Sequence, residues 1–291
     1  MRRQITLQLD AAAVPTAEAL LALAGAESIA LADAGDDPVL EPAPETAPLW
    51  PHVTLRAVFH ADVELGGVGE LLRSSCAARN VRIAGLHDAD WQGAIRQAFK
   101  ARPFGRRIWL APADDTQVPE GRTGIRLHMG LAFGTGEHPT TALCLEWLDA
   151  NVRAGATIVD YGCGSGVLAI AAIALGASHA WATDNDPQAL EATRANAELN
   201  GVADRLVVLA PEAMPPVATD IVAANILAGP LIALAPRLAA HARPGGALVL
   251  SGLLTTQADA VKRAYEPYCT DFAQATEQGW VCLAAIRRSA G

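Results

Sequence analysis

Apolar residues follow two spacings along the chain, one typical of strands and one typical of helices. Residues 5–9 alternate apolar with polar side chains, which predicts a half-buried strand. Similar strand patterns cover 28–32, 52–60 and 81–86, and helical spacing covers 15–23 and 65–78. The resulting order of strand, helix, strand, strand, helix, strand predicts a ferredoxin-like module in the first ninety residues.

Two segments separate these elements from each other and from the rest of the chain. Five prolines fall within 36–51, and they predict a long loop because proline neither continues a helix nor pairs inside a sheet. Residues 90–99 predict a helix that begins at Asp90 and leads into a linker at 102–105. We therefore expect one domain over 1–89, a connection over 90–110 and a second domain over 111–291.

From about residue 108 the chain alternates strands with longer helices. The expected strands are 157–161, 179–183, 206–209, 220–225 and 247–251, and the expected helices are 167–176, 187–200 and 231–242. Repeated strand–helix units predict a doubly wound, mostly parallel sheet with ligands at the carboxyl ends of its strands. The expected fold class is therefore α/β, with an N-terminal α+β domain.

Composition narrows the class of protein further. Hydrophobic residues make up 51% and charged residues 18%, which excludes a disordered chain. The net charge is 22 − 31 = −9, which argues against general binding to nucleic-acid phosphates and suits a partner rich in lysine or arginine, although solubility alone explains many acidic surfaces. The five cysteines form no CxxC pair, and neither a signal peptide nor a membrane span is indicated. These features predict a soluble, cytoplasmic protein.

The strongest chemical signal is the sequence VDYGCGSG at 159–166, between a predicted strand and a predicted helix. Its Gly-x-Gly-x-Gly spacing places glycine at 162, 164 and 166, where the backbone turns tightly and a ligand approaches closely. The third glycine of the dinucleotide fingerprint would fall at Val167, which disfavours NAD. S-adenosylmethionine has no phosphate and fits the shorter spacing.

An acidic residue for a ribose stands at the expected distance. Asp184 ends the next strand, 184 − 162 = 22 residues after Gly162, and a carboxylate accepts hydrogen bonds from both ribose hydroxyls. The alternative for Asp184 is a turn or an N-cap before Pro187, and Asp186 suits the cap better.

Other polar residues support no competing chemistry. The glycine-bearing segment 130–141 lacks the lysine of a P-loop, and the histidines show no spacing typical of a metal site. We interpret His138 as a residue that shapes its loop and assign no nucleophilic role to Cys163. Asn225, at the end of a strand, offers a carbonyl oxygen to the cleft, and its alternative is a strand-end turn residue.

Four segments together resemble the PrmA family of S-adenosylmethionine-dependent methyltransferases, which modify the eleventh protein of the large ribosomal subunit. They are GLAFGTGEHPTT at 130–141, VDYGCGSG at 159–166, TDNDPQALEATRANAELNGV at 183–202 and ANILAGPL at 224–231. The resemblance covers most of 100–291 and extends more loosely to the first module. His128-Met129, where Asp-Pro is expected, and Ile95, where a second tryptophan is common, depart from the pattern.

The resemblance implies a Rossmann-like class I methyltransferase domain with a seven-stranded sheet, preceded by a ferredoxin-like domain that recognises the ribosomal substrate. It implies methyl transfer from S-adenosylmethionine to lysine side-chain and N-terminal amines, without a metal. The residues that it places at the cofactor are Thr141, Gly162, Gly164, Asp184 and Asn225. Asn225 is also the candidate for positioning the acceptor amine, and no catalytic base is assigned.

Two alternatives remain open at this point. The same chemistry with a different acceptor would methylate lysines of another protein. A non-catalytic module with the methyltransferase fold would only dock a partner, although the intact glycines and Asp184 count against that reading.

Overall fold

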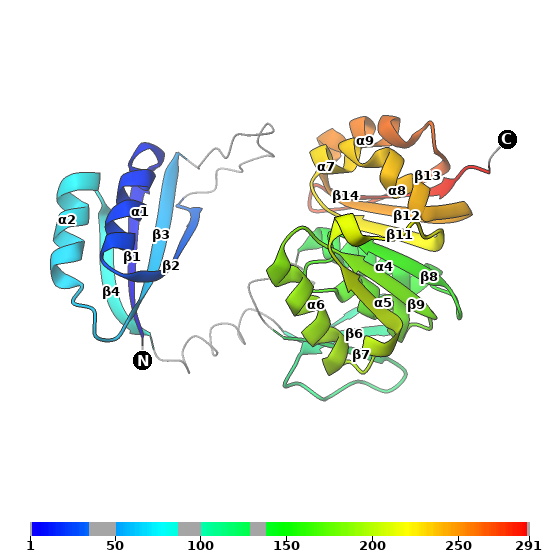
Figure 1. The fold of residues 1–291 in the computed structure, drawn as a ribbon, viewed down its shortest axis with the longest axis horizontal. Helices are drawn as coiled ribbons and strands as arrows, with labels where there is room; N and C mark the ends of the chain where they lie inside the picture. The colour runs from blue at the N-terminus through cyan, green and yellow to red at the C-terminus, as the bar shows by residue number, and fades with distance from the viewer. Residues whose placement is uncertain (1, 35–50, 87–99, 129–137, 290–291) are drawn as a thin grey trace. The chain divides into compact units, whose positions relative to one another are not determined.

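The computed structural model describes residues 2–34, 51–86, 100–128 and 138–289 (Figure 1). The chain divides into two compact units, 1–97 and 98–291. The expected helix at 90–99, most of the expected loop at 36–51 and most of the segment 130–141 lie outside the described residues, as do Ile95 and Met129.

Unit 1 is a four-stranded antiparallel sheet with two helices on one face. Its elements are β1 (Arg2–Asp10), the 3-10 turn η1 (Ala11–Ala13), α1 (Val14–Leu23), β2 (Ala26–Asp33), β3 (His52–His60), α2 (Gly66–Cys76) and β4 (Arg79–Leu86). The strand order β2-β3-β1-β4 is that of a ferredoxin-like fold, as the order of patterns predicted.

Strand alternation gives this sheet one apolar and one polar face. Ile5, Leu7 and Leu9 of β1 are fully buried and pack with α1 and α2 in a single core. The alternate residues Gln4, Thr6 and Gln8 lie on the opposite face, which neither α1 nor α2 covers (Figure 1). The unit therefore has a core on one side of its sheet and a polar surface on the other.

Unit 2 begins with a small sheet that the hydrophobic pattern did not predict. Its strands are β5 (Arg102–Phe104), β6 (Ile108–Pro112) and β7 (Thr123–Leu127), followed by α4 (Pro139–Asn151). Asp149 of α4, which is 7% exposed, accepts the backbone N–H groups of Arg106 and Arg107 at 2.7 and 2.8 Å. A buried carboxylate thus fixes the β5–β6 turn against the helix.

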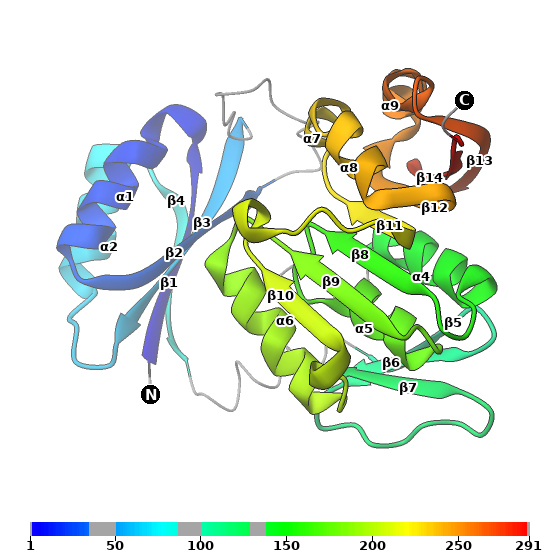
Figure 2. The same ribbon diagram turned by 45° about the vertical axis from the view of Figure 1, so that its right-hand side comes forward.

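The main sheet of unit 2 has seven strands in the order β10-β9-β8-β11-β12-β14-β13 (Figure 2). The five from β10 to β12 are parallel, whereas β14 and β13 run antiparallel to their neighbours. The strands are β8 (Thr157–Tyr161), β9 (His179–Thr183), β10 (Leu206–Leu209), β11 (Thr219–Asn225), β12 (Ala242–Leu254), β13 (Cys269–Glu277) and β14 (Trp280–Arg287). This arrangement confirms the predicted class I methyltransferase fold.

Helices cover both faces of this sheet. The helices besides α4 are α5 (Val167–Ala174), α6 (Pro187–Leu199), α7 (Ala228–Ala233), α8 (Ala235–His241) and α9 (Ala258–Tyr265), with 3-10 turns η2 (Ala203–Arg205), η3 (Pro211–Ala213) and η4 (Thr255–Gln257). One buried cluster joins α4, α5 and α6 to the sheet, and a second joins α7, α8 and α9 to its other face. Within the described residues, no helix is both long and apolar enough to span a membrane.

Two sequence-based boundaries were wrong in this region. The single helix expected at 231–242 is two short helices, because Pro236 has no N–H and its ring collides with the carbonyl four residues earlier. The strand expected at 247–251 extends over Ala242–Leu254 and includes the Pro-Gly-Gly sequence that was expected to precede it.

Gly252 in β12 permits a close backbone approach beside the carboxyl end of β11. Its φ is +90°, the strand register shifts there, and a Cβ would overlap the backbone of Ile226. Gly245, in the same strand, also has a positive φ of +74°, but a Cβ there would meet nothing closer than 3.9 Å.

We predict that Gly252→Ala lowers the free energy of unfolding by on the order of 3 kcal/mol, because strain at positive φ adds to a backbone collision. Gly245→Ala, the matched control, bears the strain alone and loses about 1 kcal/mol. Urea unfolding of both variants measures the difference. Equal losses would show that the approach to Ile226 is not constrained.

Candidate functional site

The glycine-rich turn lies at the carboxyl end of β8, where β8 neighbours β11 and the strand order reverses. Gly162, Gly164 and Gly166 have φ values of +77°, +54° and +78°, a conformation that other residues adopt only with strain. The N–H groups of Gly162 and Cys163 donate to the carbonyl of Thr183 at 2.8 and 3.0 Å. The turn is thereby tied to the end of β9.

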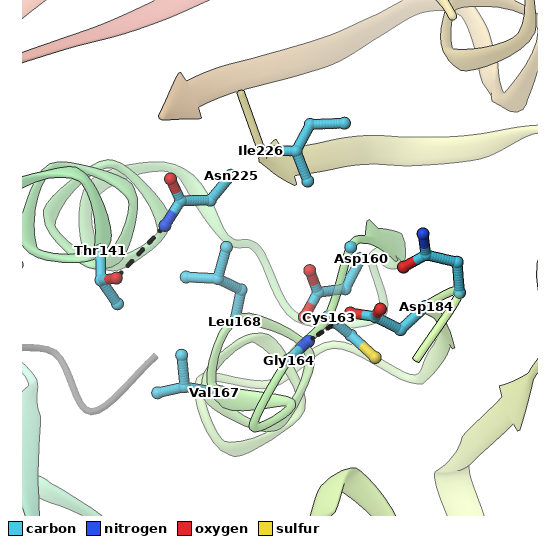
Figure 3. Close-up of a pocket in the computed structure, with 11 residues that line it drawn as sticks. Thr141, Asp160, Cys163, Gly164, Val167, Leu168, Asp184, Asn225 and Ile226 are labelled. Carbon is cyan, nitrogen blue, oxygen red and sulfur yellow. Dashed lines mark hydrogen bonds between the residues drawn. The ribbon is translucent and has the colours of Figure 1, made fainter. Parts of the chain in front are cut away.

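The same turn packs closely against the end of β11. A Cβ at Gly162 would overlap the side chain of Ile226, so glycine is needed for the approach as well as for the backbone angle. The turn and the first residue after β11 therefore form opposite sides of one crevice (Figure 3).

Asp184 follows β9 and closes the crevice from a second strand. Its Oδ2 accepts the N–H of Gly164 at 2.9 Å, and its Oδ1 accepts the N–H of Asp186 at 3.0 Å. Asp186 is the N-cap of α6 and accepts from Gln188 at 2.9 Å, as the sequence suggested. Asp184 thus holds the turn and also lines the cavity.

Asp160, the last acidic residue of β8, also lines the cavity, and sequence reasoning missed it. Its side chain is 1% exposed, and Oδ2 accepts the N–H of Ala169 in α5 at 3.1 Å. Burial, opposed by that hydrogen bond and reinforced by the nearby Asp184 charge, raises the pKa of Asp160 to about 7. The sequence signal that could have identified Asp160 is its position just before the Gly-rich turn.

Asn225 ends β11 and contacts the first turn of α4. Its Nδ2 donates to Oγ1 of Thr141 at 3.2 Å, which fixes the orientation of the amide. Its Oδ1 is buried and accepts no hydrogen bond from the described residues. Because a buried acceptor without a donor is costly, this oxygen is suited to a ligand N–H or O–H.

His138 and Cys163 have structural positions. His138 is the N-cap of α4, and its Nδ1 accepts the N–H of Thr140 at 3.4 Å, which confirms its interpretation as a residue that shapes the loop. Cys163 accepts a hydrogen bond from Thr193 at 3.3 Å, and burial raises the pKa of its thiol, so the nucleophilic thiolate is disfavoured. Within the described part of the chain, no group of three or more His, Cys, Asp or Glu residues is placed to hold a metal ion.

All five residues that the sequence placed at the cofactor line one cavity of about 220 Å³ (Figure 3). An adjoining cavity of about 490 Å³ shares Gly162, Asp184 and Ile226 with it and continues to Pro211 and Glu212 beyond β10. The described residues that line the two cavities include no Lys or Arg. Carboxylates without basic residues suit a cationic ligand and disfavour a pyrophosphate.

S-adenosylmethionine fits these residues on three counts. The turn leaves no room for a Cβ at Gly162. Asp160 and Asp184 provide carboxyl oxygens of the kind that suits its cationic groups and ribose hydroxyls, and Asn225 has a buried acceptor without a donor among the described residues.

Comparison with known proteins agrees with this geometry. The family model for ribosomal protein L11 methyltransferase, PrmA, matches residues 2–288. The chain belongs to this family. Ribosomal protein L11 methyltransferases of Hahella chejuensis and Pseudomonas putida are 45% and 44% identical to it over 98% of this chain and 98–99% of theirs. The crystal structure of ribosomal protein L11 methylase from Lactobacillus delbrueckii subsp. bulgaricus is 31% identical, with a TM-score of 0.60, and covers 66% of this chain and 100% of its own.

Membership of the PrmA family confirms the predicted enzyme class and co-substrate. The chain is a class I methyltransferase that depends on S-adenosylmethionine. The roles of individual residues toward the co-substrate stay predictions.

We predict that Asp184→Asn weakens binding of S-adenosylmethionine at least tenfold, because an amide group replaces one acceptor oxygen with a donor. Asp186→Asn is the matched control, since asparagine caps a helix as well as aspartate does. Isothermal titration of both variants measures the dissociation constants. Equal affinity of Asp184→Asn and the unmodified protein would remove Asp184 from the binding site.

We predict that Asp160 makes the ligand-free protein less stable as pH rises from about 4 to 7. The folded state holds the Asp160 proton up to about pH 7 and the unfolded state releases it near 3.8, so the folded state binds more protons in this window. Relative to the Asp160→Asn variant, the free energy of unfolding of the unmodified protein should fall by up to about 1.4 kcal/mol per pH unit and level off above pH 7. Urea unfolding at pH 5, 6, 7 and 8 measures both slopes, and parallel slopes would contradict the assignment.

Proposed function

We propose that this chain transfers methyl groups from S-adenosylmethionine to lysine side-chain and N-terminal amines of ribosomal protein L11. Relatives of that name match 98% of the chain at 42–45% identity. The observation that carries the reaction is the Asn225–Thr141 pair, which holds beside the acid-lined cavity a buried acceptor oxygen that no described residue bonds.

Methyl transfer requires a neutral amine whose lone pair faces the methyl group. S-adenosylmethionine, when bound, supplies that methyl group on a positively charged sulfur. Oδ1 of Asn225 would accept an N–H of the amine, and the hydrogen bond from Nδ2 to Thr141 keeps that oxygen in place. Most of the rate enhancement then comes from positioning.

No side chain needs to act as a strong base. An α-amine has a reference pKa of about 7.7–8.0 and a lysine about 10.4, and removal of the amine from water lowers both values. His138 is the N-cap of α4, and its side chain accepts a hydrogen bond from the backbone of that helix. We therefore assign deprotonation of the amine to desolvation and solvent, and positioning to Asn225.

The charges of the side chains that line the site favour both the co-substrate and the acceptor. Asp184 and Asp160 provide carboxyl groups for the cationic co-substrate. The absence of Lys and Arg among the described lining residues leaves nothing there to repel an incoming lysine.

The proposal also assigns parts to the chain's segments. We assign recognition of the ribosomal protein to residues 1–89, connection to 90–110 and catalysis to 111–291. The polar sheet face of unit 1, with Gln4, Thr6 and Gln8, is a surface available for this recognition. A cytoplasmic location is part of the same proposal, because its substrate is a ribosomal component.

We predict that Asn225→Ala reduces turnover on ribosomal protein L11 by about 100-fold, because the amine loses its acceptor at the reacting centre. Asn151→Ala is the control, since that asparagine is exposed and bonds only its own helix at Trp147. Radiolabelled S-adenosylmethionine and purified large-subunit proteins, followed by mass spectrometry, measure the methyl groups gained. Full turnover by Asn225→Ala would refute its role.

The same assay separates the alternative functions. Labelling of a different protein, with ribosomal protein L11 unmodified, would change the acceptor and keep the reaction class. Failure of the chain to bind S-adenosylmethionine would favour the docking module.

A further inference from the structure

Two aromatic rings meet at the carboxyl end of the main sheet, near Asn225. The ring of His138 lies 4.5 Å from that of Trp280 between centroids, and the two planes make an angle of 70°. His138 precedes α4, three residues before Thr141, and Trp280 begins β14. The chain brings them together although 142 positions separate them, since 280 − 138 = 142.

Strand register places this pair relative to the site. Asn225 pairs with Ser251 of β12, and Ser251 pairs with Cys282 of β14, so the three lie in one row across the sheet. Trp280 lies two residues beyond Cys282, toward the carboxyl ends of β11 and β12, and alternate residues share a face. With about 5 Å between strands and about 3.3 Å per residue along a strand, its backbone lies about 12 Å from that of Asn225.

The residues on the two sides of Asn225 along the sheet differ in chemical character. Toward β8 and β9 lie the glycine turn and Asp184, which fit the co-substrate. Toward β12 and β14 lies the His138–Trp280 pair. An acceptor that reaches the methyl group must therefore approach from the side that the co-substrate leaves open.

We propose that Trp280, supported by His138, forms an aromatic wall that receives the acceptor amine and holds its methylated ammonium group. This inference rests on the proposed function. A lysine stem packs against aromatic rings, and a methylated ammonium is attracted to the face of an indole. Such a wall retains a monomethylated or dimethylated amine in position for the next transfer.

The charges around the wall suit a cation. Burial lowers the pKa of His138, so its ring is neutral at pH 7 and does not repel an ammonium group. Glu277 of β13 pairs directly with Trp280, so both side chains lie on one face of the hairpin. Within the described residues Glu277 has no ion-pair partner, and its charge is available to attract an incoming lysine.

The chain contains a matched control for this pair. His179 and Trp181 form a similar contact, with centroids 4.4 Å apart and an angle of 68°, but His179 begins β9, at the amino end of the parallel strands and opposite the end that bears Asn225. Trp181→Leu removes an indole from an equivalent His–Trp contact away from the site. Its stability and activity report what such a loss does in general.

The test compares Trp280→Leu, Trp280→Phe and Trp181→Leu as full-length proteins with ribosomal protein L11. We expect Trp280→Leu to raise KM for the ribosomal protein about tenfold and to shift the products toward fewer methyl groups per amine. The dissociation constant for S-adenosylmethionine should change less than twofold. Trp280→Phe should recover most of the affinity, and Trp181→Leu should match the unmodified protein.

A second measurement does not depend on turnover. An N-acetyl trimethyllysine amide, added with S-adenosylhomocysteine, should shift one indole N–H resonance, which Trp280→Leu removes and Trp181→Leu retains. An unchanged KM and product distribution in Trp280→Leu would overturn the proposed aromatic wall. Losses of co-substrate affinity and thermal stability in Trp280→Leu as large as its loss of affinity for the ribosomal protein would also overturn it. If the unmodified protein methylates no amine yet the resonance shifts, the proposed function fails and the wall stands. If it methylates no amine and the resonance does not shift, both fail.

Discussion

The position of Ile226 between two glycines is the constraint on which the site depends. Gly162 of the β8 turn and Gly252 of β12 both lie so close to this residue that neither tolerates a Cβ. Ile226 is also bonded to the end of β12, where its N–H donates to the carbonyl of Ser251 at 3.1 Å. Because Asn225 immediately precedes it, the close packing around Ile226 fixes the place of the Asn225 amide, which we propose to orient the acceptor amine. A parallel sheet whose order reverses at β8 and β11 opens a crevice there, and the glycines determine its width.

Inside that crevice, two carboxyl groups differ in their surroundings. Asp184 bonds backbone N–H groups with both oxygens, whereas Asp160 is almost fully buried with one such bond, and its pKa rises to about 7. Asp160 is therefore only partly ionised near neutral pH in the ligand-free protein. A cationic ligand would favour ionisation of Asp160, so binding of S-adenosylmethionine is expected to release a proton.

The sequence predicted the features that are local. Alternation in 5–9, the glycine turn and Asp184 each depend on residues close together in the chain, and the structure has them where they were expected. The sequence-based prediction failed where contacts between residues far apart in the chain determine the local structure. The turn between the short strands β5 and β6 is held by Asp149 of a distant helix. Strand β12 begins earlier than expected because Ala242 pairs with Thr219 of β11, and the pairing resumes at Ala247 after the Pro-Gly-Gly sequence. The register that aligns Trp280 with His138 has no local signature at all.

The proposed assignments place each charge where the reaction requires it. Transfer of a methyl group from a sulfonium to a neutral amine moves one positive charge from sulfur to nitrogen. Before transfer the charge lies on the β8–β9 side, next to Asp160 and Asp184. Afterwards it lies on the amine, toward Trp280 and Glu277, where an indole face and a carboxylate stabilise it. Asn225 stands between the two sides and carries no charge, so it orients the amine without favouring the charge on either side. An acidic residue in its place would hold the incoming amine as an ammonium ion, whose nitrogen has no lone pair for transfer.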